Sequence, residues 1–91
     1  MVIECDPAKD AANQKKHGVS LVLAADFDWD AVRVQPARTE GTEVRFRVQG
    51  KVRGVLYSAI VTDRGGSKRV ISLRRANRKE RDAYAAEVWR S

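Results

Sequence analysis

Apolar and polar residues alternate along the middle of the chain, which is the pattern of half-buried β-strands. Val32 and Val34 flank an arginine, and Val44, Phe46 and Val48 are interleaved with two further arginines. Successive residues of a strand point to opposite faces of a sheet, so each stretch has one apolar and one polar face. We therefore expect two strands that cover a core on one side only.

The following stretch, Val55–Thr62, is apolar or small almost throughout, which is typical of a strand buried on both faces. It should lie at the centre of the sheet. Residues 63–67 contain two adjacent glycines and predict a hairpin turn, after which residues 68–74 return as a strand. Gly50 is expected to mark the turn that precedes the central strand.

The N-terminal segment predicts a short strand over residues 1–5 followed by helices. Asp6 and Pro7 supply an N-cap and a first-turn proline, and Gly18 supplies a stop, so the first helix should span residues 7–17. Ser20 is placed to cap a second short helix over residues 21–27.

A final helix is predicted over residues 78–90. Asn77 and Glu80 have the spacing of a capping box, and apolar positions recur with helical period after them. We expect this helix to pack back on the sheet. The elements together predict an α+β fold: a small antiparallel sheet of about four to five strands, two N-terminal helices and one C-terminal helix, in a single domain over residues 1–91.

Charge is distributed unevenly along the 91 residues, whose net charge is +6. Residues 1–43 hold five Lys/Arg and eight Asp/Glu, whereas residues 44–91 hold thirteen and four. Twelve of the basic residues are arginines, whose planar fork matches phosphate oxygens. A polyanion, most simply a nucleic acid, is the expected partner, and a solvated basic face that only aids solubility is the alternative.

Several function classes are disfavoured by what the sequence contains. The longest nearly apolar run, Val19–Ala25, is far shorter than the roughly 20 residues that a bilayer span needs. Cys5 is the single cysteine and His17 the single histidine, which cannot supply the four ligands of a structural zinc site. The stretch Gly65–Lys68 lacks the upstream glycine of a phosphate-binding loop. We expect a cytoplasmic protein without metal or cofactor.

Three groups of residues follow one another along the chain in an order that is specific in combination. They are Asp6-Pro7-Ala8-Lys9 with Asn13 and Lys16-His17-Gly18-Val19-Ser20; Glu43-Val44-Arg45-Phe46; and Thr62-Asp63-Arg64-Gly65 leading to Arg69-Val70-Ile71-Ser72-Leu73-Arg74-Arg75-Ala76, with Glu80-Arg81 and Tyr84. In these motifs the chain resembles the BrnT toxins of bacterial type II toxin–antitoxin systems over nearly its whole length.

The resemblance implies a RelE-like ribonuclease fold, cleavage of RNA that arrests translation and growth, and neutralisation by a BrnA-like antitoxin. A homodimer, or a heterotetramer with the antitoxin, is the implied assembly. The chain departs from the family at Cys5, where an aromatic residue is usual, and at Leu21-Val22-Leu23, where an aromatic and acidic residues are usual. The N-terminal half therefore diverges more than the C-terminal half.

RNA cleavage without a metal uses the adjacent 2′-hydroxyl as nucleophile, so the protein must remove its proton, neutralise the phosphorane and protonate the 5′-oxygen. Arginine suits the second task because it keeps its charge. Arg64 from the hairpin tip, with Arg74 and Arg75 from the strand end, is expected to form one phosphate clamp. Because consecutive strand residues face opposite ways, one of the pair should be catalytic, and we favour Arg75 together with Arg64.

Proton transfer has several candidates, each with a structural alternative. His17 has a suitable intrinsic pKa but sits where histidines commonly cap helices. Glu43 could accept the 2′-hydroxyl proton or form a surface ion pair, Lys68 could act if its neighbours lower its pKa, and Tyr84 could contact RNA or pack structurally. The basic side chains expected to bind the RNA backbone are Arg45, Arg47, Lys68, Arg69 and Arg78.

Two other functions explain the same charge. The chain could be a nucleic-acid-binding regulatory module without chemistry, in which the basic helix 78–90 enters a groove. It could also be a protein whose basic face only docks an acidic partner. Convergence of arginines at turn and strand ends favours the ribonuclease.

Overall fold

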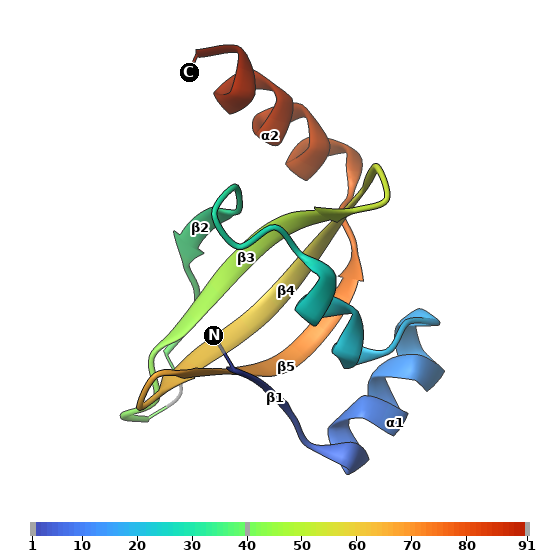
Figure 1. Cartoon of the computed structure of the whole chain (residues 1–91), viewed down its shortest axis with the longest axis vertical. Coiled ribbons are helices and arrows are strands. Elements are labelled where there is room, and N and C mark those ends of the chain that lie inside the picture. The colour runs from blue at the N-terminus through green and yellow to red at the C-terminus, as the bar shows by residue number, and fades with distance from the viewer. Residues whose placement is uncertain (1, 40, 91) are drawn as a thin grey trace.

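The computed structural model describes residues 2–39 and 41–90, with side chains described as far as residue 87. A single five-stranded sheet forms the body of the molecule (Figure 1). The elements, in chain order, are β1 (Val2–Cys5), α1 (Pro7–His17), the 3-10 helix η1 (Leu21–Asp26), β2 (Arg33–Pro36), β3 (Arg45–Val52), β4 (Val55–Arg64), β5 (Ser67–Arg75) and α2 (Arg78–Arg90).

The strand order is β1-β5-β4-β3-β2, which confirms that the apolar fourth strand is central. Strands β2 to β5 form an antiparallel meander, but β1 pairs in parallel with β5. The expectation of a purely antiparallel sheet is therefore wrong, and the sheet is mixed. The sequence of β1 does not indicate which strand it pairs with, because its partner β5 lies more than 60 residues farther along the chain.

One face of the sheet is covered by the N-terminal segment, and we call it the covered face. Leu21 and Ala24 of η1 are fully buried, and Phe27 lies beside them. Figure 1 shows η1 crossing in front of the central strands. The strand residues that complete this core are Val48, Val52, Ala59, Val61, Val70 and Leu73.

The second N-terminal helix is a 3-10 helix of six residues rather than an α-helix over residues 21–27. Ser20 caps it as expected, accepting a hydrogen bond from the Val22 N–H at 3.2 Å. The Asp10 carboxylate accepts hydrogen bonds from the Leu21 N–H at 2.8 Å and the Ser20 hydroxyl at 2.9 Å. These bonds lower the pKa of Asp10 and tie the start of η1 to α1, so tertiary contacts fix this short element.

Helix α1 has the predicted bounds. Asp6 accepts a hydrogen bond from the Ala8 N–H, and Gly18 ends the helix with a φ of 74°. Its one buried side chain is Asn13, whose amide donates to the carbonyls of Val19 and Leu73 and accepts from the Leu73 N–H. Because the pairing of β1 with β5 ends at Val70, this amide takes the place of a neighbouring strand farther along β5.

Gly50 lies inside β3 and does not mark a turn, so that prediction is wrong. A Cβ built at Gly50 would lie 2.6 Å from Cδ2 of Phe27, which shows that the phenyl ring packs directly on the backbone there. The turn is made by Arg53 and Gly54, both with positive φ. The predicted hairpin between β4 and β5 is confirmed, with positive φ at Gly65 and Gly66.

Helix α2 begins with the predicted capping box. The Glu80 N–H donates to Asn77 Oδ1 at 2.8 Å, and the Asn77 N–H donates to Glu80 Oε1 at 2.9 Å. The helix nevertheless extends beyond the end of the sheet (Figure 1), and none of its described side chains is buried. The expectation that it packs back on the sheet is wrong, and the three alanines of the helix, Ala83, Ala85 and Ala86, offer little apolar surface to bury.

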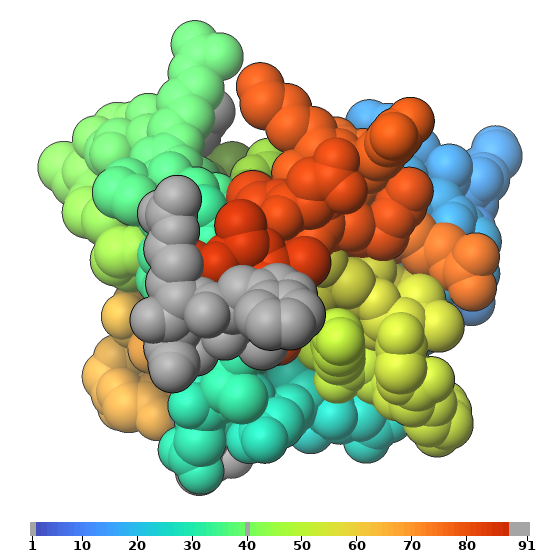
Figure 2. All heavy atoms as spheres, turned by 90° about the horizontal axis from the view of Figure 1, so that it is seen from above, coloured from blue at the N-terminus to red at the C-terminus, as the bar shows by residue number. Residues whose placement is uncertain are grey.

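Polar contacts hold α2 at the end of the sheet. Glu87 forms an ion pair with Arg33 at 2.7 Å, and the ring of Tyr84 lies under the Lys51 ammonium at 5.4 Å. Seen from above, the helix, coloured orange to red, lies between the green segment that contains β2 and the yellow-green turn after β3 (Figure 2). No helix in the described part of the chain is long and apolar enough to cross a membrane.

Candidate nucleic-acid interface

The sheet face opposite the core is lined with arginines, and we call it the arginine face. Register partners in adjacent strands share a face, and Arg47 pairs with Gln35 and Ile60, whereas its neighbours Phe46 and Val48 turn toward the core. The same alternation places six arginines on this face: Arg33, Arg45, Arg47, Arg64, Arg69 and Arg74. The N-terminal elements cover the other side of the sheet, and α2 contacts the arginine face at one end, through Glu80 and Glu87.

Four side chains from four elements meet at one end of the arginine face, and we call them the Glu80 cluster. Arg74 donates two hydrogen bonds to the Glu80 carboxylate, from Nη1 at 2.7 Å and from Nη2 at 3.1 Å. The Ser58 hydroxyl donates to Glu80 Oε2 at 3.2 Å and accepts from Arg47 Nη1 at 2.7 Å. Arg47 Nη1 itself lies 3.6 Å from Glu80 Oε2, so two guanidinium groups share one carboxylate.

The Glu80 side chain is only 14% exposed, so burial and the groups around its carboxylate both affect its pKa. Burial alone would raise the pKa of Glu80, but hydrogen bonds from Arg74, the Asn77 N–H and Ser58, with the positive charge of Arg74, lower it to about 2. Glu80 is therefore ionised at neutral pH and is a poor proton acceptor.

A second cluster lies at the other end of the arginine face. Glu43 accepts a hydrogen bond from Arg45 Nε at 3.1 Å and lies 3.9 Å from Nη2 of Arg64. An open depression of about 550 Å³ adjoins these residues and is lined by Thr42, Glu43, Val44, Phe46, Thr62, Asp63 and Arg64. A carboxylate half-buried between two guanidinium groups thus borders a space that a phosphodiester could enter.

The expectation that Arg64, Arg74 and Arg75 form one clamp is wrong. Arg64 pairs with Ser67 at the hairpin, whereas Arg74 pairs with Ser58, six residues farther along β4. At the usual rise per strand residue this places their backbones about 20 Å apart. Residues that follow a hairpin turn move away from its tip, so the end of β5 lies far from Arg64.

The other predicted site residues are spread over the molecule. Arg75 pairs with Tyr57 on the covered-face side of the strands, opposite to Arg74. His17 is exposed in the last turn of α1, and Arg78 is exposed on α2 beside Asp82. Tyr84 lies on α2, where its hydroxyl group is 3.4 Å from the Ala31 carbonyl. Of the predicted site residues, the structure brings Glu43, Arg45 and Arg64 together, and Arg47 and Arg74.

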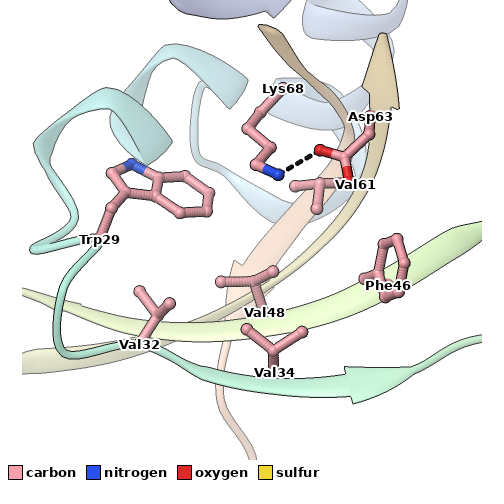
Figure 3. A pocket seen from close by; sticks show the side chains of 8 residues that line it. All are labelled: Trp29, Val32, Val34, Phe46, Val48, Val61, Asp63 and Lys68. Carbon is pink, nitrogen blue, oxygen red and sulfur yellow. Dashed lines mark hydrogen bonds and ion pairs between the residues drawn. The ribbon is translucent and has the colours of Figure 1, made fainter. Parts of the chain in front are cut away.

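Lys68 forms an ion pair with Asp63 beside a pocket on the covered face (Figure 3). The pocket has a volume of about 330 Å³, and its wall is mainly apolar. It is lined by Trp29, Val32, Val34, Phe46, Val48, Val61, Asp63 and Lys68. Lys68 therefore points to the opposite side of the sheet from Arg45 and Arg47, away from the arginine face.

Ser58 and Glu80 are the residues of the Glu80 cluster that were not predicted as site residues. The spacing of Asn77 and Glu80 predicts a helix cap, and Glu80 also belongs to the motif that resembles the family, but neither observation predicts a contact with Arg47 or Arg74. Its position six residues after Arg74, in the first turn of the next helix, is the sequence signal for a second role. Within residues 2–39 and 41–87, no three His, Cys, Asp or Glu side chains form a group that could hold a metal ion.

The ribonuclease toxin family BrnT of type II toxin–antitoxin systems matches residues 5–80. The chain belongs to the BrnT family. The matched range includes both arginine clusters and ends at Glu80. No curated protein shows significant similarity to this BrnT member.

Proposed function

We propose that this BrnT chain is a ribonuclease toxin that cuts RNA on the arginine face without a metal ion, arrests translation and growth, and is neutralised by a BrnA-like antitoxin. Residues 1–91 then act as one toxin domain with a RelE-like fold. The observation that carries the proposal is a sheet face with six arginines, opposite the face that the N-terminal elements cover, in a chain of a ribonuclease toxin family.

The two clusters suit different tasks. An RNA strand lying along the arginine face would contact the Glu80 cluster at one end and Glu43 with Arg64 at the other. Arg47 and Arg74 would bind backbone phosphates at one end, and the intervening arginines would extend the contact. Such contacts are independent of base identity, which suits an enzyme that must hold the chain near its cut site.

We assign the chemistry to Glu43 and Arg64. Glu43 accepts the proton of the 2′-hydroxyl as that oxygen attacks the phosphorus, and the bond to the 5′-oxygen breaks to leave a 2′,3′-cyclic phosphate and, after protonation, a 5′-hydroxyl. Arg64, 3.9 Å from Glu43, faces the charge that develops on the phosphorane. His17 and Tyr84 are the other candidates for proton transfer, and Arg75 is the other candidate for catalysis.

Expression of the chain in a bacterium, alone and together with the adjacent reading frame, tests the toxin assignment. We expect growth arrest with the chain alone, arrest relieved by the neighbour, and no arrest with Glu43→Gln. Growth unaffected by a soluble, folded chain would contradict the toxin. Purified protein that binds RNA tightly and leaves it intact would favour a regulatory module without chemistry.

A further inference from the structure

We propose that Glu80 is the positioning residue for RNA phosphates on the arginine face: its carboxylate holds Arg74 and Arg47 in an orientation that phosphate oxygens can use. This inference rests on the proposed function, because it concerns how the arginine face binds RNA. It adds a residue whose negative charge would by itself repel the substrate.

The backbone and side chain of Glu80 are fixed before any RNA binds. The capping box ties its N–H to Asn77 Oδ1 at 2.8 Å and its Oε1 to the Asn77 N–H at 2.9 Å. The carboxylate is thus anchored to the start of α2 rather than swinging on a flexible side chain. A side chain held in this way can fix the position of its partners.

The geometry of Arg74 leaves one bidentate edge of its guanidinium group for a phosphate. A guanidinium group can present either its two terminal nitrogens or its Nε with one terminal nitrogen. Glu80 occupies the terminal pair, through Nη1 at 2.7 Å and Nη2 at 3.1 Å. Among the described residues, Nε of Arg74 has no hydrogen-bond partner, so the Nε edge can receive two phosphate oxygens.

Glu80 also allows a second guanidinium group to lie close by. Arg47 approaches the same carboxylate at 3.6 Å and is bound by Ser58, which in turn donates to Glu80 at 3.2 Å. Without the carboxylate, the two cations would repel each other and separate. With it, arginines from β3 and β5 converge on one place above the sheet.

The test exploits two opposite expectations for Glu80→Gln. Removing a negative charge from an RNA-binding surface should strengthen binding if only net charge matters. If Glu80 positions the arginines, binding should instead weaken, by about 10-fold for the loss of one or two charge-assisted hydrogen bonds. Glutamine can still complete the capping box, so the start of α2 is retained.

Asp82→Asn is the matched control, because it removes the same charge from the exposed side of α2, where the Asp82 side chain is 74% exposed. Affinity is measured by fluorescence anisotropy with a labelled 2′-O-methyl oligoribonucleotide, which cannot be cut, so the result does not depend on cleavage. We expect weaker binding for Glu80→Gln and equal or stronger binding for Asp82→Asn. Circular dichroism and thermal melts establish that both variants are folded.

Ser58→Ala provides a second variant without a change of charge. It removes the hydroxyl group that links Arg47 to Glu80, and we expect it to weaken binding in the same direction. The proposal is overturned if folded Glu80→Gln or Ser58→Ala binds the oligonucleotide as well as the wild type or better. If the wild type binds but does not cut RNA, the ribonuclease proposal fails while the positioning proposal is still decided by this comparison.

Discussion

The guanidinium group of Arg74 and the carboxylate of Glu80 form two hydrogen bonds, of 2.7 and 3.1 Å, across the junction between β5 and α2. The pair joins the end of β5 to the first turn of α2. This helix otherwise contacts the sheet through a few polar side chains. One largely buried carboxylate therefore links the position of α2 to the orientation of two arginines on the arginine face.

The pH dependence of stability should report this pair. The pKa of Glu80 is lowered from an ordinary value of 4.5 to about 2 in the folded protein. A carboxylate with a lower folded pKa stabilises the fold fully above its unfolded pKa, and this contribution is lost as the pH falls toward the folded value. Glu80→Gln should lower the free energy of unfolding at pH 7 by about 2 kcal/mol, and the difference from wild type should shrink between about pH 5 and pH 2.

Urea denaturation of both proteins across that pH range provides the measurement. Asp82→Asn, in the same helix but largely exposed, should change stability little at any of these pH values. A stability difference between wild type and Glu80→Gln that stays constant from pH 7 to pH 2 would show that the ionised carboxylate is not its source.

Asn13 should be the most sensitive polar position outside the arginine face. Its buried amide makes three hydrogen bonds to the backbone of Val19 and Leu73, so Asn13→Ala leaves several buried backbone groups without partners. We expect a loss of about 3 kcal/mol in the free energy of unfolding. Gln14→Ala, one position away on the exposed side of α1, is the control and should have little effect.

The local sequence predicted the elements of this fold better than their arrangement. The cap at Asp6, the stop at Gly18 and the glycines of the last hairpin act within a few residues, and all three appear as predicted. The parallel partner of β1 and the role of Gly50 depend on residues far away in the chain. A glycine between two apolar stretches predicts a turn, and the contact of Gly50 with Phe27 that explains it forms only when η1 docks on the sheet.

The candidate site shows the same division. Alternation within strands predicts that Arg74 and Arg75 face opposite ways, and the register places them so. The separation of Arg64 from Arg74 follows from the direction in which β5 leaves its turn. The convergence of Arg47, Ser58 and Glu80 requires three separate segments to be placed in space, which spacing along the chain does not reveal.

Alanine variants of three arginines should fail in different ways. Arg64→Ala should reduce the cleavage rate at saturating RNA by about 10²–10³-fold, because it removes a donor to the phosphorane. Arg74→Ala should weaken binding and reduce the salt dependence by about one unit. The Arg75→Ala variant should cut RNA near the wild-type rate, because position 75 of β5 lies on the covered face of the sheet, opposite to Arg74. Single-turnover cleavage and binding at several salt concentrations separate these effects, and a large rate loss in Arg75→Ala alone would restore it as the catalytic arginine.

The antitoxin should occlude the arginine face. A small partner with acidic residues near Arg64 and Arg74 would neutralise RNA binding and stabilise the toxin by mass action. Arg64→Glu should therefore weaken the complex with the antitoxin in calorimetric titrations, whereas the exposed Arg78→Glu on α2 should weaken it less. A structure of the complex with the arginine face open and the partner confined to the covered face would contradict this means of neutralisation.

Cleavage of RNA in the presence of EDTA tests the central claim most directly. Purified wild-type protein, freed of its antitoxin, is mixed in excess with end-labelled RNA, and the products are resolved on a sequencing gel beside Glu43→Gln and Arg64→Ala. We expect the wild type to cut in EDTA and leave 2′,3′-cyclic phosphate ends, with both variants folded but strongly impaired. Cleavage that requires an added divalent ion, or that persists unchanged in both variants, would contradict a metal-independent ribonuclease on the arginine face.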